Sequence, residues 1–312
     1  MQTVRNRVAD ILGIDLPIVQ APMNYIAGHA LAAAVSAAGG MGVLGPNAGK
    51  VQGEEISMRE RTLREFSRIR EVTDKPVGIN VVVPDGDNKA ALMYARNTVE
   101  AAAEGGATAA FCVGGLQPSI FELIKSKGMK LVVRPLTPTV KNAREAQAMG
   151  ADIFVATGYD AGGFLPSHHT GTFSIVPTIV DVVTIPVLAA GGINDLRGVR
   201  AAFALGAEGV YVGTRFIATN ECAANDHAKE LICKLSGSNL LYVDETQRSL
   251  PTEFAAEAYV KHRLAPTVPT TVDLVGALRT GMYDGEPDKG IVTVNTGIDV
   301  IRSVVPAAQV VS

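Results

Sequence analysis

Two glycine-rich segments hold the residues best suited to binding an anion. Residues 190–195 read Ala-Gly-Gly-Ile-Asn-Asp and residues 213–216 read Gly-Thr-Arg-Phe, and each segment ends a short apolar run. Glycine lets backbone N–H groups approach a phosphate closely, and a helix that starts just beyond adds its positive N-terminal end. These glycines could also serve only as tight turns, but the pair of loops favours a phosphate site at Gly191, Gly192, Gly213 and Thr214.

A third segment, residues 158–171, could supply acid–base chemistry. It reads Gly-Tyr-Asp-Ala-Gly-Gly-Phe-Leu-Pro-Ser-His-His-Thr-Gly and holds one carboxylate, Asp160, with two adjacent histidines, His168 and His169. Histidine changes charge near neutral pH, which suits proton transfer. Adjacent histidines point in different directions, and no further His or Cys is spaced to complete a metal site, so we predict no metal. A solvated lid is the alternative for this loop.

Three further residues stand at the ends of apolar runs. Met23, after Gln-Ala-Pro, has a soft side chain on which a flat aromatic cofactor could rest, although taken alone such a residue is more often core filler. Asn80 has an amide that both donates and accepts, as the edge of a heterocycle requires. Arg134 needs an anionic partner if it points inward; the alternative is an outward salt bridge.

The elements that position these residues repeat one theme, a short apolar run followed by a turn and an Ala-rich amphipathic stretch. The repeat predicts eight strands and a (β/α)8 TIM barrel, in which the active site lies at the carboxyl ends of the strands. Pro118, Asp195, Gly150 and Gly206 stand where helix starts and ends are expected. The predicted strands are residues 17–20, 41–44, 77–82, 109–113, 130–134, 153–157, 186–190 and 209–212.

The βα rhythm stops after residue 219. Residues 220–289 are polar, helix-rich and interrupted by scattered prolines, which predicts a smaller, mainly helical lobe appended near the C-terminus. We expect this lobe to act as a lid that sets substrate size. Residues 1–219 then form the barrel, and residues 290–312 return to it.

Composition limits the classes of partner. The chain has 312 residues, 47% hydrophobic, and a formal charge of −3, so no strong field gathers nucleic acid or anionic membrane. Small molecules are the expected partners, and the Ala-rich faces are compatible with a homodimer. Three cysteines without C-x-x-C spacing predict neither a disulfide framework nor zinc, and suit the cytoplasm. The first apolar run is cut by Asp15 and Pro17, too early for a signal peptide or a membrane span.

Together these residues resemble the nitronate monooxygenase family, which includes 2-nitropropane dioxygenase-like proteins and the flavin-dependent enoyl-ACP reductase II. The matching pieces are residues 20–23, 37–42, 80, 114–115, 158–163, 189–193 and 209–216. The resemblance implies non-covalent FMN, with its phosphate at the two glycine loops. It also implies that the ring lies near Ala21, Pro22, Met23 and Asn80, and that Gly162 and Gly163 belong to the cofactor site.

Two departures from the family pattern affect the expected chemistry. The family usually reads Glu-Ala-Gly-Gly-His in the sixth loop, whereas here Asp160 replaces Glu and Phe164 stands where the catalytic His is expected. His168 or His169, a few residues later, could fold back to the flavin, and we predict that one of them matters for turnover. Asn295-Thr296 stands where the family has Gly-Gln, which alters the pocket wall.

Several activities stay open on the sequence alone. An alkyl nitronate is already an anion, so its oxidation by FMN and O2 needs no base. Reduction of an enoyl thioester or a quinone needs NADH or NADPH, and the thioester also needs a proton donor, such as Tyr159 or a lid His. In either case Arg134 could stabilise the anionic reduced flavin. A non-catalytic FMN sensor would explain the missing His without a replacement.

A further alternative is the inosine-monophosphate dehydrogenase type of barrel, which shares the phosphate loops. That chemistry needs a nucleophilic Cys after the sixth strand. The chain has none between Phe154 and Gly171, and Cys112 falls in a predicted buried strand. The sequence therefore disfavours this reading.

Overall fold

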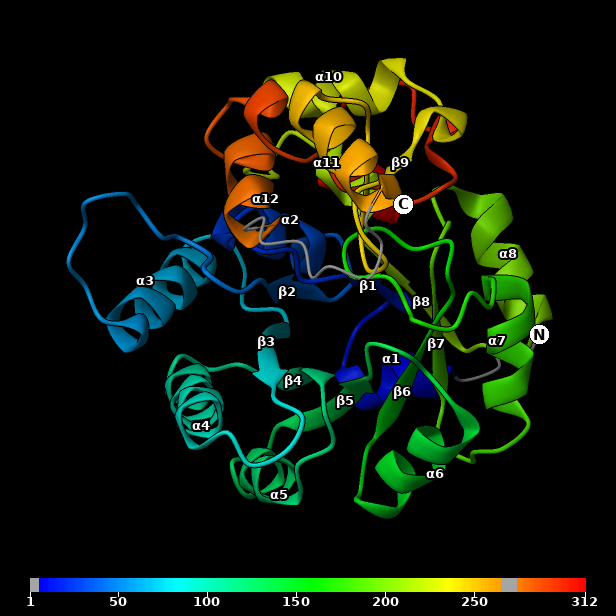
Figure 1. Ribbon diagram of the computed structural model, residues 1–312. Coiled ribbons are helices and arrows are strands. Elements are labelled where there is room, and N and C mark those ends of the chain that lie inside the picture. The colour runs from blue at the N-terminus through cyan, green and yellow to red at the C-terminus, as the bar shows by residue number, and fades with distance from the viewer. Residues whose placement is uncertain (1–5, 265–273) are drawn as a thin grey trace.

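A computed structural model describes residues 6–264 and 274–312 (Figure 1). In this part of the chain, eight parallel strands form one sheet whose helices lie outside it, which confirms the predicted (β/α)8 barrel. Every predicted strand is present with its ends shifted by at most one residue. The strands are β1 (Ile18–Gln20), β2 (Gly42–Leu44), β3 (Val77–Val83), β4 (Ala109–Gly114), β5 (Lys130–Arg134), β6 (Ile153–Thr157), β7 (Val187–Ala190) and β8 (Gly209–Val212).

The strand order is β1-β8-β7-β6-β5-β4-β3-β2, which brings the first two strands together to close the barrel. Their contact is a single isolated bridge, between Val19 and Met41. The buried side chain of Gln20 adds to it, because its Oε1 accepts a hydrogen bond from the backbone N–H of Val43 at 3.0 Å. A side-chain amide thus supplements the backbone ladder at this junction.

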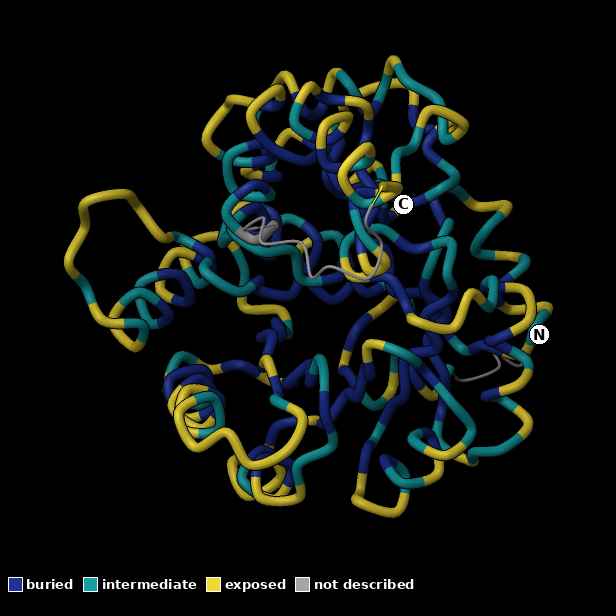
Figure 2. Tube along the Cα trace, viewed as in Figure 1, coloured by how far each residue is buried: buried dark blue, intermediate teal, exposed yellow. Residues whose placement is uncertain are grey.

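The strands are buried on both faces, as a helix-covered parallel sheet requires. All residues of β6, β7 and β8 are buried. One apolar cluster, including Val19, Phe111 and Leu188, fills the barrel interior, and a larger one lies between the sheet and the helices. Figure 2 shows this buried centre with exposed loops around it.

Helix signals in the sequence are also confirmed. Pro118 occupies the first turn of its helix, and Asp195 caps its helix through hydrogen bonds from the backbone N–H groups of Arg197 and Gly198. Gly150 and Gly206 follow helix ends with φ of 86° and 91°. The helices that precede residue 220 are α1 (Arg7–Leu12), α2 (His29–Ala37), α3 (Met58–Arg70), α4 (Lys89–Glu104), α5 (Pro118–Ser126), α6 (Val140–Ala148), α7 (Thr172–Val180), α8 (Leu196–Ala204) and α9 (Thr214–Ile217).

The C-terminal part contributes additional helices, with α10, α11 and α12 grouped together in Figure 1. It also contains a two-stranded antiparallel hairpin that the sequence did not predict. A small apolar cluster that includes Val243, Ala255 and Ile291 packs these elements together. They are α10 (Asp226–Lys234), η1 (Gly237–Asn239), β9 (Leu241–Tyr242), β10 (Arg248–Ser249), α11 (Glu253–Leu264), α12 (Leu274–Met282), η2 (Pro287–Lys289), η3 (Ile298–Val300) and α13 (Ala307–Val311). Among the helices described, none is long and apolar enough to span a membrane.

Candidate functional site

A cavity of about 930 Å³ lies at the carboxyl ends of the barrel strands. It brings together residues that the sequence singled out from six different strand ends. Those that line it are Ala21, Pro22, Met23, Asn80, Arg134, Gly162, Gly163, Gly191, Gly192, Gly213 and Thr214. Asp160, His168 and His169 are not among its lining residues.

The two glycine loops meet on one wall of the cavity. Gly191 and Gly192 have φ of 110° and 72°, in the left-handed region that favours glycine. A Cβ at Gly191 would lie 2.7 Å from Thr172 Oγ1, so no larger residue fits there. Gly213 precedes α9 without a side-chain cap, and a Cβ there would meet only Ala21 at 3.8 Å. The loops therefore leave backbone open toward the cavity.

Thr214 is held so that its hydroxyl hydrogen can reach a ligand. Its Oγ1 accepts a hydrogen bond from the backbone N–H of Asn295 at 3.0 Å, and the residue is buried. Asn295 in turn forms a reciprocal amide pair with Asn194, at 3.0 Å and 2.8 Å. This pair ties the loop after β7 to the C-terminal segment and, through Thr214, to the loop after β8. Asn295 thus supports the glycine wall where the family pattern has a different residue.

Arg134 is a buried cation at the cavity wall. It is 9% exposed, and its guanidinium donates long hydrogen bonds to Thr157 Oγ1 at 3.3 Å and to the backbone oxygen of Phe164 at 3.4 Å. Burial lowers the pKa of Arg134. Burial raises the pKa of Tyr211, and the positive charge of Arg134 partly offsets that rise. No carboxylate of the described residues pairs with it, so the alternative of an outward salt bridge is wrong. A buried guanidinium without a counter-ion fits an anionic ligand.

Asn80 lies deeper in the same cavity. Its Nδ2 donates to the backbone oxygen of Phe111 at 3.1 Å, which fixes the amide and leaves its oxygen to accept from a ligand. Met23 is partly buried and packs against the core, and it also lines the cavity. Ala21, Pro22 and Met23 form a small apolar surface beside the glycine wall.

The loop after β6 has a structural and a solvent-facing part. Asp160 Oδ2 accepts the backbone N–H of Thr172 at 2.6 Å, at the start of α7, and its backbone oxygen accepts from Thr296. The carboxylate therefore holds the loop rather than facing the cavity. His168 and His169 are exposed, and the His169 ring packs on Tyr159 at 4.2 Å. Their predicted part in turnover has no cavity contact to support it.

Phe164 stands at the rim of the cavity and is 47% exposed. Val82, Tyr94 and Leu136 are also large, exposed apolar side chains that line this cavity. Exposed apolar groups that gather at one opening are typical of a ligand-binding mouth. The position where the family has a catalytic base is therefore part of an apolar rim.

The C-terminal part contributes lining residues that the sequence did not indicate. Gln247, Leu278, Met282 and Thr293 also line the cavity. Beside Gln247, Arg248 is fully buried, with its guanidinium carbon 4.9 Å from the Tyr159 ring centroid, and it donates to the backbone oxygen of Tyr159. No local pattern signals Arg248, because Tyr159, its partner, lies about ninety positions away along the chain.

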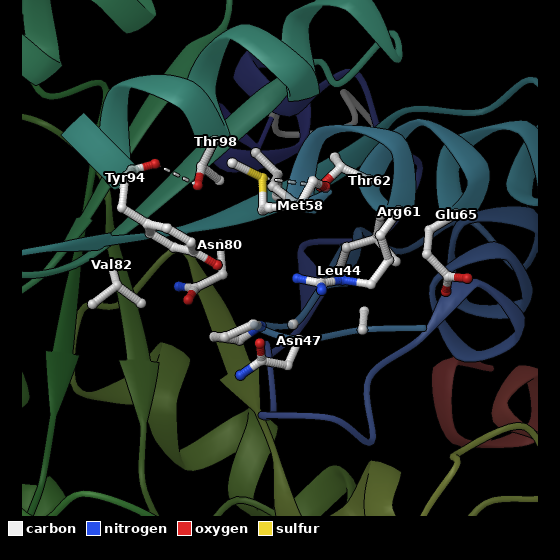
Figure 3. Close-up of a pocket in the computed structure, with 14 residues that line it drawn as sticks. Leu44, Asn47, Met58, Arg61, Thr62, Glu65, Asn80, Val82, Tyr94 and Thr98 are labelled. Atoms are coloured by element: carbon white, nitrogen blue, oxygen red, sulfur yellow. Dashed lines mark hydrogen bonds between the residues drawn. The ribbon is translucent and has the colours of Figure 1, made fainter. Parts of the chain in front are cut away.

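A small bay of about 30 Å³ adjoins the cavity, since Pro46, Asn47, Asn80, Val82 and Tyr94 line both. Figure 3 shows Arg61 reaching from α3 into this bay. Its volume suits about one water molecule. The bay is therefore an annex of the cavity and not a second ligand site.

Metal and thiol chemistry find no support in the described part of the chain. There, no group of three or more His, Cys, Asp or Glu is placed to hold a metal ion. Cys112 lies buried in β4, and burial raises the pKa of its thiol well above the usual range. The cavity lining contains no cysteine, which removes the nucleophile that the inosine-monophosphate dehydrogenase reading needs.

Comparisons with known proteins agree with this geometry. FabK from Thermotoga maritima is 31% identical, with a TM-score of 0.84 over 99% of this chain and 94% of that one. A nitroalkane oxidase from Streptomyces ansochromogenes, 24% identical with a TM-score of 0.73 over 98% of this chain and 95% of its own, shares the fold. A probable nitronate monooxygenase from Staphylococcus saprophyticus is 28% identical over an alignment of 315 positions that covers 88% of this chain and 86% of its own.

A curated relative from Rhodococcus jostii is 34% identical over 234 residues, or 73% of this chain. It is a (3aS,4S,5R,7aS)-5-hydroxy-7a-methyl-1-oxo-octahydro-1H-indene-4-carboxyl-CoA dehydrogenase, and the match spans 60% of its length. The family model for nitronate monooxygenase matches residues 5–312. The family and the relatives together indicate an oxidoreductase. This chain belongs to the nitronate monooxygenase family.

Proposed function

We propose that this chain is an FMN-dependent oxidoreductase. The observation that carries the proposal is the convergence on one cavity of two glycine loops, the Thr214 hydroxyl and the Arg134 guanidinium, which pairs with no carboxylate of the described residues. Such a donor set matches an anionic, flat, phosphate-bearing cofactor. FMN, when bound, supplies hydride or electron transfer, and the protein supplies orientation and charge.

Each part of the cavity has a role under this proposal. Gly191, Gly192, Gly213 and Thr214 would hold the phosphate, and Ala21, Pro22 and Met23 would support the ring. Asn80 would accept from an N–H at the ring edge, and Arg134 would stabilise negative charge on the reduced ring. The segment from 220 to 289, through Gln247, Leu278 and Met282, would exclude water as a lid.

Oxidation of alkyl nitronates is the first candidate reaction. No histidine lines the cavity among the described residues, and Phe164 occupies the rim where a base is expected. A nitronate needs no proton removed, and Arg134 would attract its negative charge. A neutral nitroalkane needs a base, whose absence costs about 10²–10⁴-fold in rate.

Reduction of an enoyl thioester by NADH or NADPH is the second candidate, and the mostly apolar walls of the cavity favour it. Under this proposal the volume of about 930 Å³ has to hold both FMN and the substrate. The rim of Val82, Tyr94, Leu136 and Phe164 would receive a bulky acyl group. One relative, 60% of whose length the match spans, is a carboxyl-CoA dehydrogenase.

Two measurements test the proposed function. Titration of the ligand-free protein with FMN should shift and quench the flavin spectrum at one site per chain; an absence of binding would refute the proposal. The loaded protein is then mixed anaerobically with NADH, NADPH or propyl nitronate, and the loss of yellow colour identifies the reductant. Binding of FMN without bleaching by any of the three would instead indicate a sensor.

A further inference from the structure

Tyr211 carries a hydroxyl group that no described residue binds. The residue lies in β8, is 7% exposed and lines the cavity. Its hydroxyl group forms no hydrogen bond with the described residues, yet it is not one of the unpaired polar atoms that the protein encloses completely. Those enclosed atoms are Arg64 Nε, Gln247 Oε1 and Arg248 Nε. The Tyr211 hydroxyl group therefore keeps some open surface, and the cavity is the space that this residue lines.

The ring of Tyr211 is fixed in the barrel interior. Its backbone is in register with Val19 of β1 and with Ala190 of β7. The centroid of its ring lies 6.1 Å from that of Phe111, with an angle of 35° between the two planes. All four residues belong to the apolar cluster that fills the interior. Because this packing holds the ring, Tyr211 cannot easily turn its hydroxyl group away from the cavity.

Arg134 lines the same cavity from β5, which two strands separate from β8. Each of the two groups shifts the pKa of the other, so they lie close enough to interact. They form no hydrogen bond with each other, because the guanidinium donates to Thr157 Oγ1 and to the backbone oxygen of Phe164. Burial raises the pKa of Tyr211, which keeps the phenol protonated and able to donate. Two donors, one of them charged, thus border one space.

We propose that Tyr211 and Arg134 together bind one negatively charged oxygen atom of the cavity ligand, with a hydrogen bond from the phenol and another from the guanidinium. Buried polar groups are costly to leave unpaired, and such an oxygen satisfies both. This inference rests on the proposed function, since the oxygen belongs either to the ring of reduced FMN or to an anionic substrate such as a nitronate. In the first case Tyr211 stabilises the reduced cofactor, and in the second it selects an anion over a neutral substrate.

The first test uses the ligand-free protein and does not depend on activity. Tyr211→Phe removes only the hydroxyl group and keeps the packed ring, so the melting temperature should stay within about 2 °C of the wild type or rise. A larger fall would show that the hydroxyl group is bonded inside the protein, and would overturn the proposal. Tyr283→Phe is the matched control for the binding measurements, because Tyr283 is partly buried and does not line the cavity.

The second test locates the oxygen atom. If it belongs to FMN, Tyr211→Phe should bind the reduced cofactor about tenfold more weakly relative to the oxidised one. Equilibration with a redox dye would then show a potential lower by about 30 mV, as a tenfold change gives for a two-electron couple. If the oxygen belongs to the substrate, the potential should stay unchanged. Nitrate, an unreactive planar anion, should instead bind the loaded protein about tenfold more weakly, measured by the perturbation of the flavin absorbance.

The same two quantities decide the outcome. Both should be unchanged in Tyr283→Phe, and if both are also unchanged in Tyr211→Phe, the phenol binds no ligand oxygen and the inference alone fails. Wild-type protein that does not bind FMN would remove the proposed function and this inference together. Two residues that hold one oxygen should not act independently, so the loss in Arg134→Met/Tyr211→Phe should be at least about threefold smaller than the product of the single losses. A loss equal to that product would contradict a shared oxygen.

Discussion

At the scale of single residues, Arg134 is the group on which the proposed chemistry most depends. Arg134→Met should slow reduction of bound FMN by about tenfold or more, because a buried charged hydrogen-bond donor is lost from the cavity wall. Stopped-flow absorbance of the flavin under anaerobic conditions measures this rate. Arg134→Lys keeps the charge without the planar fork and should recover part of it. An unchanged rate in the Met variant would remove Arg134 from the mechanism.

Phe164 offers the complementary experiment, in which a missing group is introduced. Phe164→His places an imidazole on the cavity rim, so turnover of a neutral nitroalkane should rise by about 10²-fold. Turnover of the pre-formed nitronate should change little, because no proton has to be removed from it. Oxygen consumption with the two forms of nitroethane measures the difference, and Phe164→Leu controls for the loss of the ring. Equal changes with both forms would contradict the account.

At the scale of elements, Asp195 links the glycine loop after β7 to α8. Its side chain caps the helix and pairs with Arg197. Asp195→Ala should lower the free energy of unfolding at pH 7 by about 1 kcal/mol, as the loss of an N-cap does. Guanidinium denaturation measures it, with the exposed Asp87, which caps no helix, as the control position for the same substitution.

The same carboxylate makes this difference depend on pH. The hydrogen bond from the Arg197 side chain is the largest cause that lowers the pKa of Asp195 below its ordinary value. A carboxyl whose pKa is lower in the folded state stabilises the fold above its unfolded pKa, and this contribution disappears as pH falls through the folded value. The gap between wild type and Asp195→Ala should therefore narrow below about pH 4. A gap that stays constant down to pH 2 would show that the charge contributes nothing.

How far the sequence reveals the fold also differs between elements. The eight strands are predictable because local apolar runs and turn residues define each of them. The β9–β10 hairpin is not, because Arg248 is held by contacts with Tyr159 far away in the chain. In the site, the glycine loops and Arg134 follow from their position after strands, whereas nothing local marks Gln247 as a lining residue. Asp160 was singled out as the carboxylate of the sixth loop, where the family has Glu; its Oδ2 accepts the N–H of Thr172 at the start of α7, and a catalytic role for it stays a prediction.

At the scale of the whole molecule, burial should protect two of the three thiols from alkylation. Burial raises the pKa of Cys222 to about 11 and that of Cys112 further, while Cys233 is only partly buried. Iodoacetamide reacts with the thiolate, so at pH 8 the folded protein should be labelled first at Cys233. Peptide mass spectrometry measures the order, and unfolding in guanidinium should make all three equal. Early labelling of Cys222 in the folded protein would show that the barrel opens near it.

The junction of β1 and β2 has a consequence for motion. Only one bridge and one side-chain amide are described between these strands, so local opening of the barrel should begin there. The amide protons of Gly42–Leu44 should therefore exchange with deuterium sooner than those of β4. Ala21 follows β1 directly and lies on the cavity wall. A ligand that packs against Ala21 would stabilise the closed junction. Hydrogen exchange at β1 and β2 should therefore become slower as the cavity is occupied.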